Sequence, residues 1–113
     1  MKKDISKYKI NKDLTLLDAL IQIEGNHHRS LIVLDNNNKV TGSLSDGDIR
    51  RALINGILLS SNIHKIMNTD YVFIEEDSTD AKIKKTFDMF DIFLLPCVDE
   101  GCRLVKLYTK SEF

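Results

Sequence analysis

The sequence contains no tryptophan, a single proline at Pro96 and only two cysteines among its 113 residues. Cys97 and Cys102 lack Cys-x-x-Cys spacing and the rest of the chain offers no partner ligands, which favours plain reduced thiols and no metal site. No apolar run approaches the roughly 20 residues that a membrane span requires, and the start of the chain lacks the apolar core of a signal peptide. We therefore expect a cytoplasmic protein with no membrane partner.

Charge of one sign is also missing. The 16 Lys and Arg residues nearly balance the 17 Asp and Glu residues, for a formal net charge of -1. This balance does not favour a general nucleic-acid-binding protein. Since 42% of the residues are hydrophobic, the composition indicates one compact globular unit rather than a disordered tail.

An internal repeat is present: residues 8–49 align with residues 72–113 without a gap. Five pairs are identical, namely Ile10 and Ile74, Asp13 and Asp77, Thr15 and Thr79, Leu31 and Leu95, and Asp35 and Asp99. Similar residues occupy further matching places, including Lys39 and Arg103, Ser45 and Thr109, and Asp48 and Glu112. The identity is low, but both copies predict the same series of elements, which indicates a tandem repeat.

In the first copy the predicted order is strand, helix, strand, strand, helix. A short strand is predicted over residues 8–10. The helix that follows begins at a capping pair, Thr15 and Asp18, and ends near Gly25. Apolar runs on either side of an Asn-rich turn predict a hairpin over residues 31–44. The last helix carries Ile49, Ala52 and Leu53 on one face and closes at Asn55-Gly56.

The second copy repeats this order with a strand over residues 71–74, a helix with Ile83, Phe87 and Phe90 on one side, and a second hairpin. It stops at Phe113, where the last helix should begin. We predict an α+β fold of two small sheets packed with helices. Residues 1–66 form the first repeat with its connector, which has a helical turn near residues 63–67. Residues 67–113 form an incomplete second repeat. Because one core would be left half covered, we expect the chain to be part of a longer polypeptide.

The turn from the first hairpin into the following helix carries the candidate chemistry. Ser45 or Asp46 can cap the helix, and Asp48 in its first turn suits the positive end of the helix dipole. Arg50 and Arg51 are unfavourable there unless they are solvated or share an anion with the helix start. Two interpretations stay open: an ordinary capped helix, or a nucleotide site with ribose hydroxyls on Asp48 and phosphate near Ser45 and the arginines.

The pattern Gly42, Ser43-Leu44, Ser45 and Asp48 matches the signature of the CBS domain family, which this sequence resembles over essentially its whole length. Members of that family occur in tandem pairs with the element order given above. The stretch SDGDIRRAL is also similar to that of CBS pairs attached to sugar nucleotidyltransferases and arabinose 5-phosphate isomerases.

The resemblance implies binding of an adenosyl nucleotide (AMP, ADP, ATP or S-adenosylmethionine) in clefts between the repeats, with no required cofactor and no metal. In the first cleft it places ribose on Asp48 and phosphate beside Ser45, with the base near Ile10 and the backbone of Leu31 and Ile32. The matching residues of the second cleft are Ile74, Leu95, Pro96, Thr109 and Glu112. The sequence departs from the family pattern with Ile32 in place of proline, Lys106 in place of the motif glycine and Glu112 in place of aspartate.

No catalytic constellation is found, because the His27-His28 pair falls in a predicted loop without a nucleophile or orienting acid. We therefore expect a regulatory segment linked covalently to a catalytic domain. The start at Met1 favours the N-terminal part of a sugar-phosphate nucleotidyltransferase; the alternatives are the CBS part of a sugar-phosphate isomerase and a ligand-free assembly module. The resemblance also implies a homodimer joined through helices, for which apolar surface is expected from Leu16, Leu17, Ile21, Phe87 and Phe90.

Overall fold

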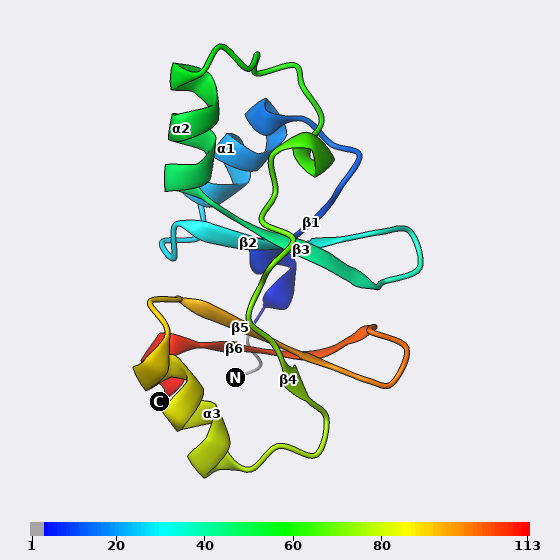
Figure 1. Cartoon of the computed structure of the whole chain (residues 1–113), viewed down its shortest axis with the longest axis vertical. Helices are drawn as coiled ribbons and strands as arrows, with labels where there is room; N and C mark the ends of the chain where they lie inside the picture. The colour runs from blue at the N-terminus through cyan, green and yellow to red at the C-terminus, as the bar shows by residue number, and fades with distance from the viewer. Residues whose placement is uncertain (1–3) are drawn as a thin grey trace.

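The computed structural model describes residues 4–113 and contains two copies of one small α+β unit (Figure 1). The first comprises a 3-10 turn, β1, α1, β2, β3 and α2, which span Ile5–Tyr8, Lys9–Asn11, Leu16–Glu24, Ser30–Leu34, Val40–Ser45 and Asp46–Ile54. A 3-10 turn at Ile63–Lys65 lies in the connector. The second copy comprises β4, α3, β5, β6 and a final 3-10 turn, which span Ile74–Glu75, Asp80–Met89, Leu94–Val98, Leu104–Thr109 and Lys110–Glu112.

Each copy has its own three-stranded sheet with the same topology. The strand orders are β1-β2-β3 and β4-β5-β6, with the first pair parallel and the second antiparallel in both sheets. Both hairpins have a register shift at matching places, between Val33 and Leu34 and between Cys97 and Val98. The two sheets face each other, with α1 and α2 on the outer side of one and α3 on the outer side of the other (Figure 1). The tandem repeat predicted from the sequence is therefore present in the fold.

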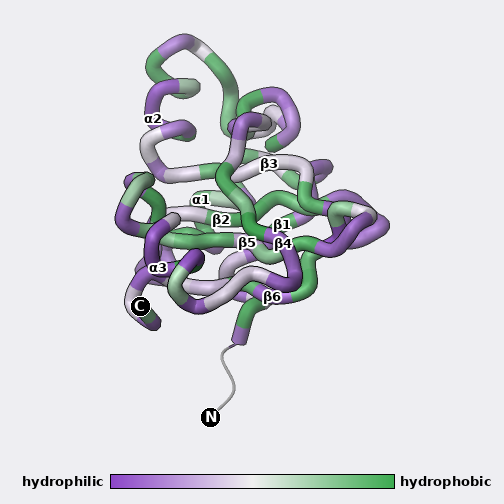
Figure 2. The backbone as a smooth tube through the Cα atoms, turned by 60° about the horizontal axis from the view of Figure 1, so that its bottom comes forward, coloured by the Kyte–Doolittle hydropathy of each residue, from purple (hydrophilic) through white to green (hydrophobic). Residues whose placement is uncertain are grey.

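Three apolar clusters form the layers of the core. One lies between the first sheet and its helices and includes Leu16, Leu31 and Ile49. A second, with Ile32 and Leu107, lies between the two sheets, and the third packs under α3. In Figure 2 the strands carry most of the hydrophobic colour and the hairpin ends are hydrophilic. Apolar burial thus joins the two sheets as well as each sheet to its helices.

The hairpin ends are closed by the same chemistry in both repeats. The Asp35 Oδ1 atom accepts hydrogen bonds from the backbone N–H groups of Asn37 and Lys39, at 2.8 and 3.0 Å. Asp99 Oδ1 accepts the equivalent bonds from Gly101 and Arg103, each at 2.9 Å. These are Asx-type turns, in which a carboxylate replaces a backbone acceptor. The aspartate identity noted in the sequence therefore has a structural cause.

Several sequence predictions of detail were wrong. The strand predicted over residues 8–10 begins one residue later, after a 3-10 turn. The strand predicted over residues 71–74 is reduced to Ile74–Glu75, because the preceding residues belong to the segment that crosses between the sheets, where Asn68 pairs with Ser43. Phe90 leaves the buried face of α3 and is 44% exposed, since it is the C-cap with extended backbone.

The apolar surface predicted for dimerisation is only partly present. Leu16 and Phe87 are buried in the cores of their own repeats, so they offer no surface to a partner. Leu17, Ile21 and Phe90 are exposed as predicted. Leu53, predicted to share one face of α2 with Ile49 and Ala52, is 38% exposed and lines a groove between α1 and α2.

In the second repeat, the 3-10 turn Lys110–Glu112 takes the place at which α2 begins in the first. The ring of Phe113 stacks on Phe87 at 6.0 Å and meets the Tyr108 ring edge-on at 5.6 Å. Aromatic contacts of this kind cover part of the face that α2 covers in the first repeat. None of the helices in the described part of the chain has the length and apolar character needed to cross a bilayer.

Candidate functional site

The turn from β3 into α2 is a reciprocal capping box. The hydroxyl of Ser45 accepts a hydrogen bond from the Asp48 backbone N–H at 3.1 Å, and Asp48 Oδ2 accepts one from the Ser45 N–H at 2.9 Å. The Asp46 N–H donates to the carbonyl of Arg29 at 3.0 Å, which fastens the turn to the loop before β2. The position of the Asp48 carboxylate is thus fixed by the backbone, and the capping role predicted from the sequence is confirmed for Ser45.

The two arginines of the motif point to different surroundings. The Arg51 guanidinium pairs with Asp48 Oδ1 at 2.7 Å, whereas Arg50 pairs with Asp46 at 3.4 Å and lines the groove between α1 and α2. The Asp48 side chain is 25% exposed and that of Arg51 is 69% exposed. Only Arg51 therefore joins the Ser45 and Asp48 constellation in this structure.

Strand pairing decides which predicted residues share a face with Ser45. Ile32 pairs with Ser43, and Ser30 pairs with Ser45. Because side chains alternate along a strand, these four residues lie on the face that Ile32 presents to the second sheet, and we call them the inter-repeat face of the first sheet. Three of the four carry hydroxyl groups. Ser45 and Ile32 are thereby brought together.

Leu31 and Ile10 have a different environment. The side chains of both are buried in the cluster under α1 and α2, on the opposite face of the sheet. They can contribute only backbone groups to the inter-repeat face. For Leu31 this agrees with the role that the resemblance implies, which uses its backbone.

The second repeat has the same turn with other chemistry. Glu112 accepts hydrogen bonds from the backbone N–H and the hydroxyl of Thr109, at 2.9 and 3.0 Å. The Lys110 N–H donates to the carbonyl of Phe93, which matches the bond from the Asp46 N–H to the Arg29 carbonyl in the first repeat.

The sheet face beside this turn differs from that of the first repeat. Thr109 is buried, and the strand positions that match Ser30 and Ser43 of the first sheet hold Leu94 and Leu107. Pro96 is fully buried beside them, and Ile74 and Leu95 lie in the cluster under α3. The second inter-repeat face is therefore largely apolar.

The glycine of the motif has a packing cause. A Cβ atom at Gly42 would lie 2.9 Å from the carbonyl oxygen of Asn68 and 3.0 Å from the Met67 side chain, so only glycine allows the crossing segment to pass. At the matching place in the second repeat Lys106 is exposed. The motif glycine is thus needed for the close passage of the crossing segment.

A groove that the sequence did not reveal lies between α1 and α2. Its floor is apolar, with Leu20, Ile23 and Ile49, and His27 and Arg29 stand at its rim. Both rim residues have positive φ angles, of 60° and 57°, which are uncommon for residues with a side chain. The buried Asn26 holds this loop by donating to the carbonyl oxygens of Lys7 and Ser30. No sequence pattern indicated this loop conformation.

The cysteines show no sign of a metal or redox centre. Cys97 and Cys102 are free thiols, and among residues 4–113 no three His, Cys, Asp or Glu side chains are grouped as a metal site would require. Burial raises the pKa of the Cys97 thiol, which lowers its reactivity as a nucleophile. The thiol of Cys102 lies 3.5 Å from the Tyr71 hydroxyl.

Fold, tandem topology and the matching capped turns together define a paired α+β module. The family model for the CBS domain matches residues 1–55. A CBS domain-containing protein of Dictyostelium discoideum is 30% identical over 118 aligned positions, covering 95% of this chain and 81% of that protein. The chain belongs to the CBS domain family and is a CBS domain pair.

Other relatives are longer than this chain. An uncharacterized protein of Helicobacter pylori is 36% identical over 84 residues, which cover 74% of this chain and 26% of that protein. The arabinose 5-phosphate isomerase GutQ of Shigella flexneri is 24% identical over 113 residues, all of this chain and 35% of the isomerase. The chain thus spans only about a quarter to a third of these two relatives.

Solved structures agree on the fold. The AcuB protein of Vibrio cholerae superposes with a TM-score of 0.84 at 24% identity, over 94% of this chain and 78% of that one. The cytosolic domain of the Mg2+ channel MgtE in complex with ATP superposes with a TM-score of 0.76 at 22% identity, over 94% and 43%. At these identities the likeness shows the shared fold alone.

Proposed function

We propose that this chain is a regulatory CBS pair that binds an adenosyl nucleotide in its first inter-repeat cleft. The observation that carries the proposal is the capped turn, in which Ser45 and Asp48 are fixed beside the hydroxyl-bearing inter-repeat face. A carboxylate held by backbone bonds is a suitable acceptor for a ribose diol. The N–H groups at the start of α2 and the Ser45 hydroxyl suit a phosphate.

The ATP complex of the MgtE cytosolic domain supports this ligand class, since it has the same fold. In the present chain, Asp48 binds the ribose and Ser45 borders the phosphate, while Ile32 and the backbone of Leu31 border the base. The first cleft is favoured over the second, because Leu94 and Leu107 replace serines on the second inter-repeat face.

The attached domain is proposed to be a sugar-phosphate enzyme. The stretch SDGDIRRAL is similar to that of CBS pairs in both sugar nucleotidyltransferases and arabinose 5-phosphate isomerases, and the similarity to GutQ favours the isomerase. A nucleotide that binds one arrangement of the two repeats more tightly shifts the conformational equilibrium of the attached domain. The size of this shift cannot exceed the difference in binding free energy between the two arrangements, typically about 1–3 kcal/mol. The CBS pair itself carries no catalytic role in this proposal.

The test is a calorimetric and thermal-shift titration with AMP, ADP, ATP and S-adenosylmethionine. Asp48→Ala should abolish the response, while a ligand at a hundred times its dissociation constant stabilises the parent protein by about 2.7 kcal/mol. Asp18→Ala is the matched control, because Asp18 closes the same kind of capping box on α1 with Thr15. It should cost similar helix stability and leave ligand binding intact. A response that persists in Asp48→Ala would contradict the proposed site.

A second candidate function is that of an assembly module without a ligand. It is favoured by the exposed apolar residues on the helices, among them Leu17, Ile21 and Ile54. Surfaces of this kind commonly mark protein contacts. This alternative predicts a dimer that none of the four ligands stabilises and that survives Asp48→Ala unchanged.

A further inference from the structure

Asn26, which lies just after α1, is a buried polar residue that is only 2% exposed. Its side-chain N–H groups donate to the carbonyl oxygens of Lys7 at 3.1 Å and Ser30 at 2.9 Å, and its side-chain oxygen accepts a hydrogen bond from the His28 N–H at 2.9 Å. The amide therefore uses both of its donors and its oxygen. Through these bonds it joins the first 3-10 turn, the loop after α1 and the start of β2.

Gln22, one turn earlier on α1, reinforces the same attachment. Its side-chain amide donates to the carbonyl oxygens of Ser6 at 3.1 Å and Lys9 at 2.6 Å. Because a buried carbonyl without a partner is costly, these bonds favour one position of the chain over Ile5–Tyr8. The 3-10 turn is thus held to the end of α1 by two side-chain amides.

The segments that Asn26 joins border the inter-repeat face of the first sheet. In Figure 1 the 3-10 turn lies between the two sheets, and the Tyr8 side chain packs on the apolar cluster there. The Tyr8 ring meets the His28 ring edge-on at 4.9 Å. Ser30 pairs with Ser45 across the hairpin and lies on the inter-repeat face itself. Asn26 therefore fixes the backbone at three points along the edge of the first cleft.

The second repeat has different side chains at these two positions. The offset of the repeat places Thr86 at the position of Gln22 and Phe90 at that of Asn26. The Thr86 hydroxyl donates within α3, to the Lys82 carbonyl at 2.8 Å, and Phe90 is 44% exposed. Since both sheets have the same topology, the fold itself does not require amides here. The attachment is a feature of the first cleft.

We propose that Asn26 is a positioning residue for ligand binding in the first inter-repeat cleft. It holds Tyr8, His28 and Ser30 in place before a ligand arrives, so that binding does not have to order them. Ordering of mobile segments lowers affinity, and a preorganised site avoids that loss. This role rests on the proposed function, because it concerns the same cleft.

The test is calorimetric titration of the full chain with AMP and with ATP, in the parent protein, Asn26→Ala and two controls. Phe90→Ala changes the matching position of the second repeat, and Asp18→Ala weakens the capping box at the other end of α1. In Asn26→Ala we expect the dissociation constant to rise about tenfold, the effect of one or two lost hydrogen bonds. Both controls should leave the dissociation constant within about twofold of the parent value.

Amide hydrogen exchange separates positioning from a general gain in stability. Without ligand, the N–H groups of residues 5–9 and 28–30 should exchange faster in Asn26→Ala than in the parent protein, because local opening is easier. Saturation with AMP should restore their protection, since the bound ligand then orders these segments. If Asn26→Ala does not fold, Gln22→Ala gives the same test, with faster exchange and weaker binding expected.

Two results would overturn this role while leaving nucleotide binding in place. One is a parent-like dissociation constant in a folded Asn26→Ala or Gln22→Ala variant. The other is an equal rise in Asp18→Ala, which would show that any loss of stability weakens binding. A folded parent protein that binds neither AMP nor ATP would overturn the proposed function as well, and the titration of the parent protein alone identifies that outcome.

Discussion

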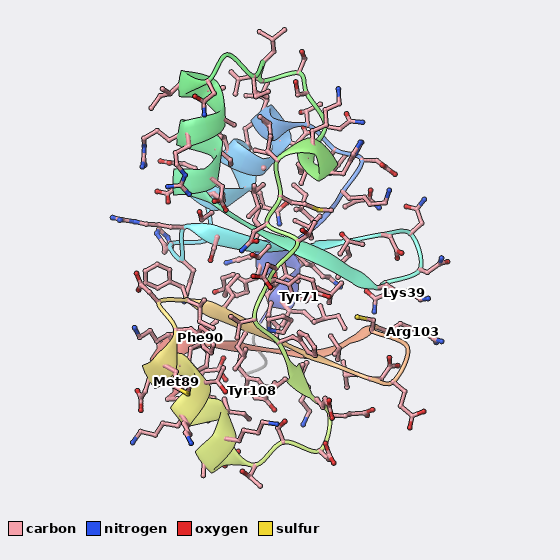
Figure 3. The ribbon with its side chains drawn as sticks, in the orientation of Figure 1. Lys39, Tyr71, Met89, Phe90, Arg103 and Tyr108 are labelled. Carbon is pink, nitrogen blue, oxygen red and sulfur yellow. The ribbon has the colours of Figure 1, made fainter. Side chains whose placement is uncertain are left out.

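Lys39 of the first repeat and Arg103 of the second face each other in an isolated antiparallel bridge. The two residues occupy matching positions in the repeat alignment. The Val40 N–H donates to the Cys102 carbonyl at 2.9 Å, and the Leu104 N–H donates to the Asn38 carbonyl at 3.0 Å. These bonds flank the bridge symmetrically, so a pseudo-twofold axis passes between the two cations. Figure 3 shows both side chains on the same side of the molecule, where the two hairpins turn.

We expect a repulsive coupling between these two cations. Favourable cross-strand pairs contribute roughly 0.2–1 kcal/mol, and like charges directly opposite each other are destabilising. A double-mutant cycle of Lys39→Gln and Arg103→Gln, measured by urea unfolding, tests this coupling. Either single substitution should relieve the repulsion and raise the free energy of unfolding, and adding the other substitution should give no further gain. The coupling should shrink in high salt because screening weakens it. A favourable or salt-independent coupling would refute this assignment.

Gly42→Ala should destabilise the protein. The new methyl group would meet the backbone oxygen of Asn68 at 2.9 Å, and backbone cannot move aside as a flexible side chain does. Overpacking of this kind typically costs about 1–3 kcal/mol. Chemical denaturation of the variant measures the loss, and an unchanged midpoint would mean that the crossing segment shifts freely.

Gly47→Ala should have the opposite sign. Its nearest neighbour would be the end of the flexible Arg51 side chain at 3.3 Å, which can give way. Alanine is better than glycine inside a helix by about 0.5–1 kcal/mol. We therefore expect a higher Tm than that of the parent protein in a calorimetric scan. A lowered Tm would show that the Arg51 and Asp48 pair contributes more than the helix gains.

Tyr71 should make the protein sensitive to alkali. Burial, helped by the neighbouring Cys102, raises the pKa of Tyr71 from 10.0 to about 12. A raised pKa means that the folded state holds the proton more tightly, so this contribution is complete below pH 10 and is lost as the pH rises through about 12.

Tyr71→Phe tests this dependence. The variant loses the hydrogen bond to the Val40 carbonyl, which is 3.1 Å long, and we expect about 1 kcal/mol less stability at neutral pH. Its deficit should narrow as the pH rises above 10, because the parent protein loses the contribution that the variant already lacks. Urea unfolding at several pH values between neutral and 11 measures the difference; a constant deficit would contradict the raised pKa.

Ile21→Lys should dissociate the homodimer that the family resemblance implies. Ile21 is 66% exposed on α1, next in the helical pattern to the exposed Leu17. A charge at an apolar contact is desolvated without a partner, which is costly. Sedimentation velocity should show a monomer with a nearly unchanged Tm, while Val105→Lys, on β6, should remain dimeric. A parent protein that is monomeric at all concentrations would rule out the dimer.

The sequence predicted the elements that local chemistry specifies. The helix of α1 has a capping box at Thr15 and an apolar face at the correct spacing, and both are present. The paired hairpins were also predicted, since apolar runs flank turn-forming residues in both copies. Phe90 was assigned wrongly because periodicity does not show where a helix ends, and the chain turns extended at that residue.

The candidate site was predicted in part. The spacing of Ser45 and Asp48 indicated the capping turn, which is local. The pairing of Asp48 with Arg51 was missed, although their spacing on a helix is that of neighbours. The separation of Arg50 from Arg51 and the groove beside α1 depend on packing between helices far apart in the chain. No local pattern encodes those contacts.

The bridge at Lys39 and Arg103 also bears on how such a protein could arise. Each repeat presents the same donor and the same acceptor to the other, so the junction is self-complementary. A shorter ancestral chain with a single repeat could have closed the same junction with a second molecule of itself. Gene duplication and fusion would then have tied the two halves together, leaving each free to change its own cleft.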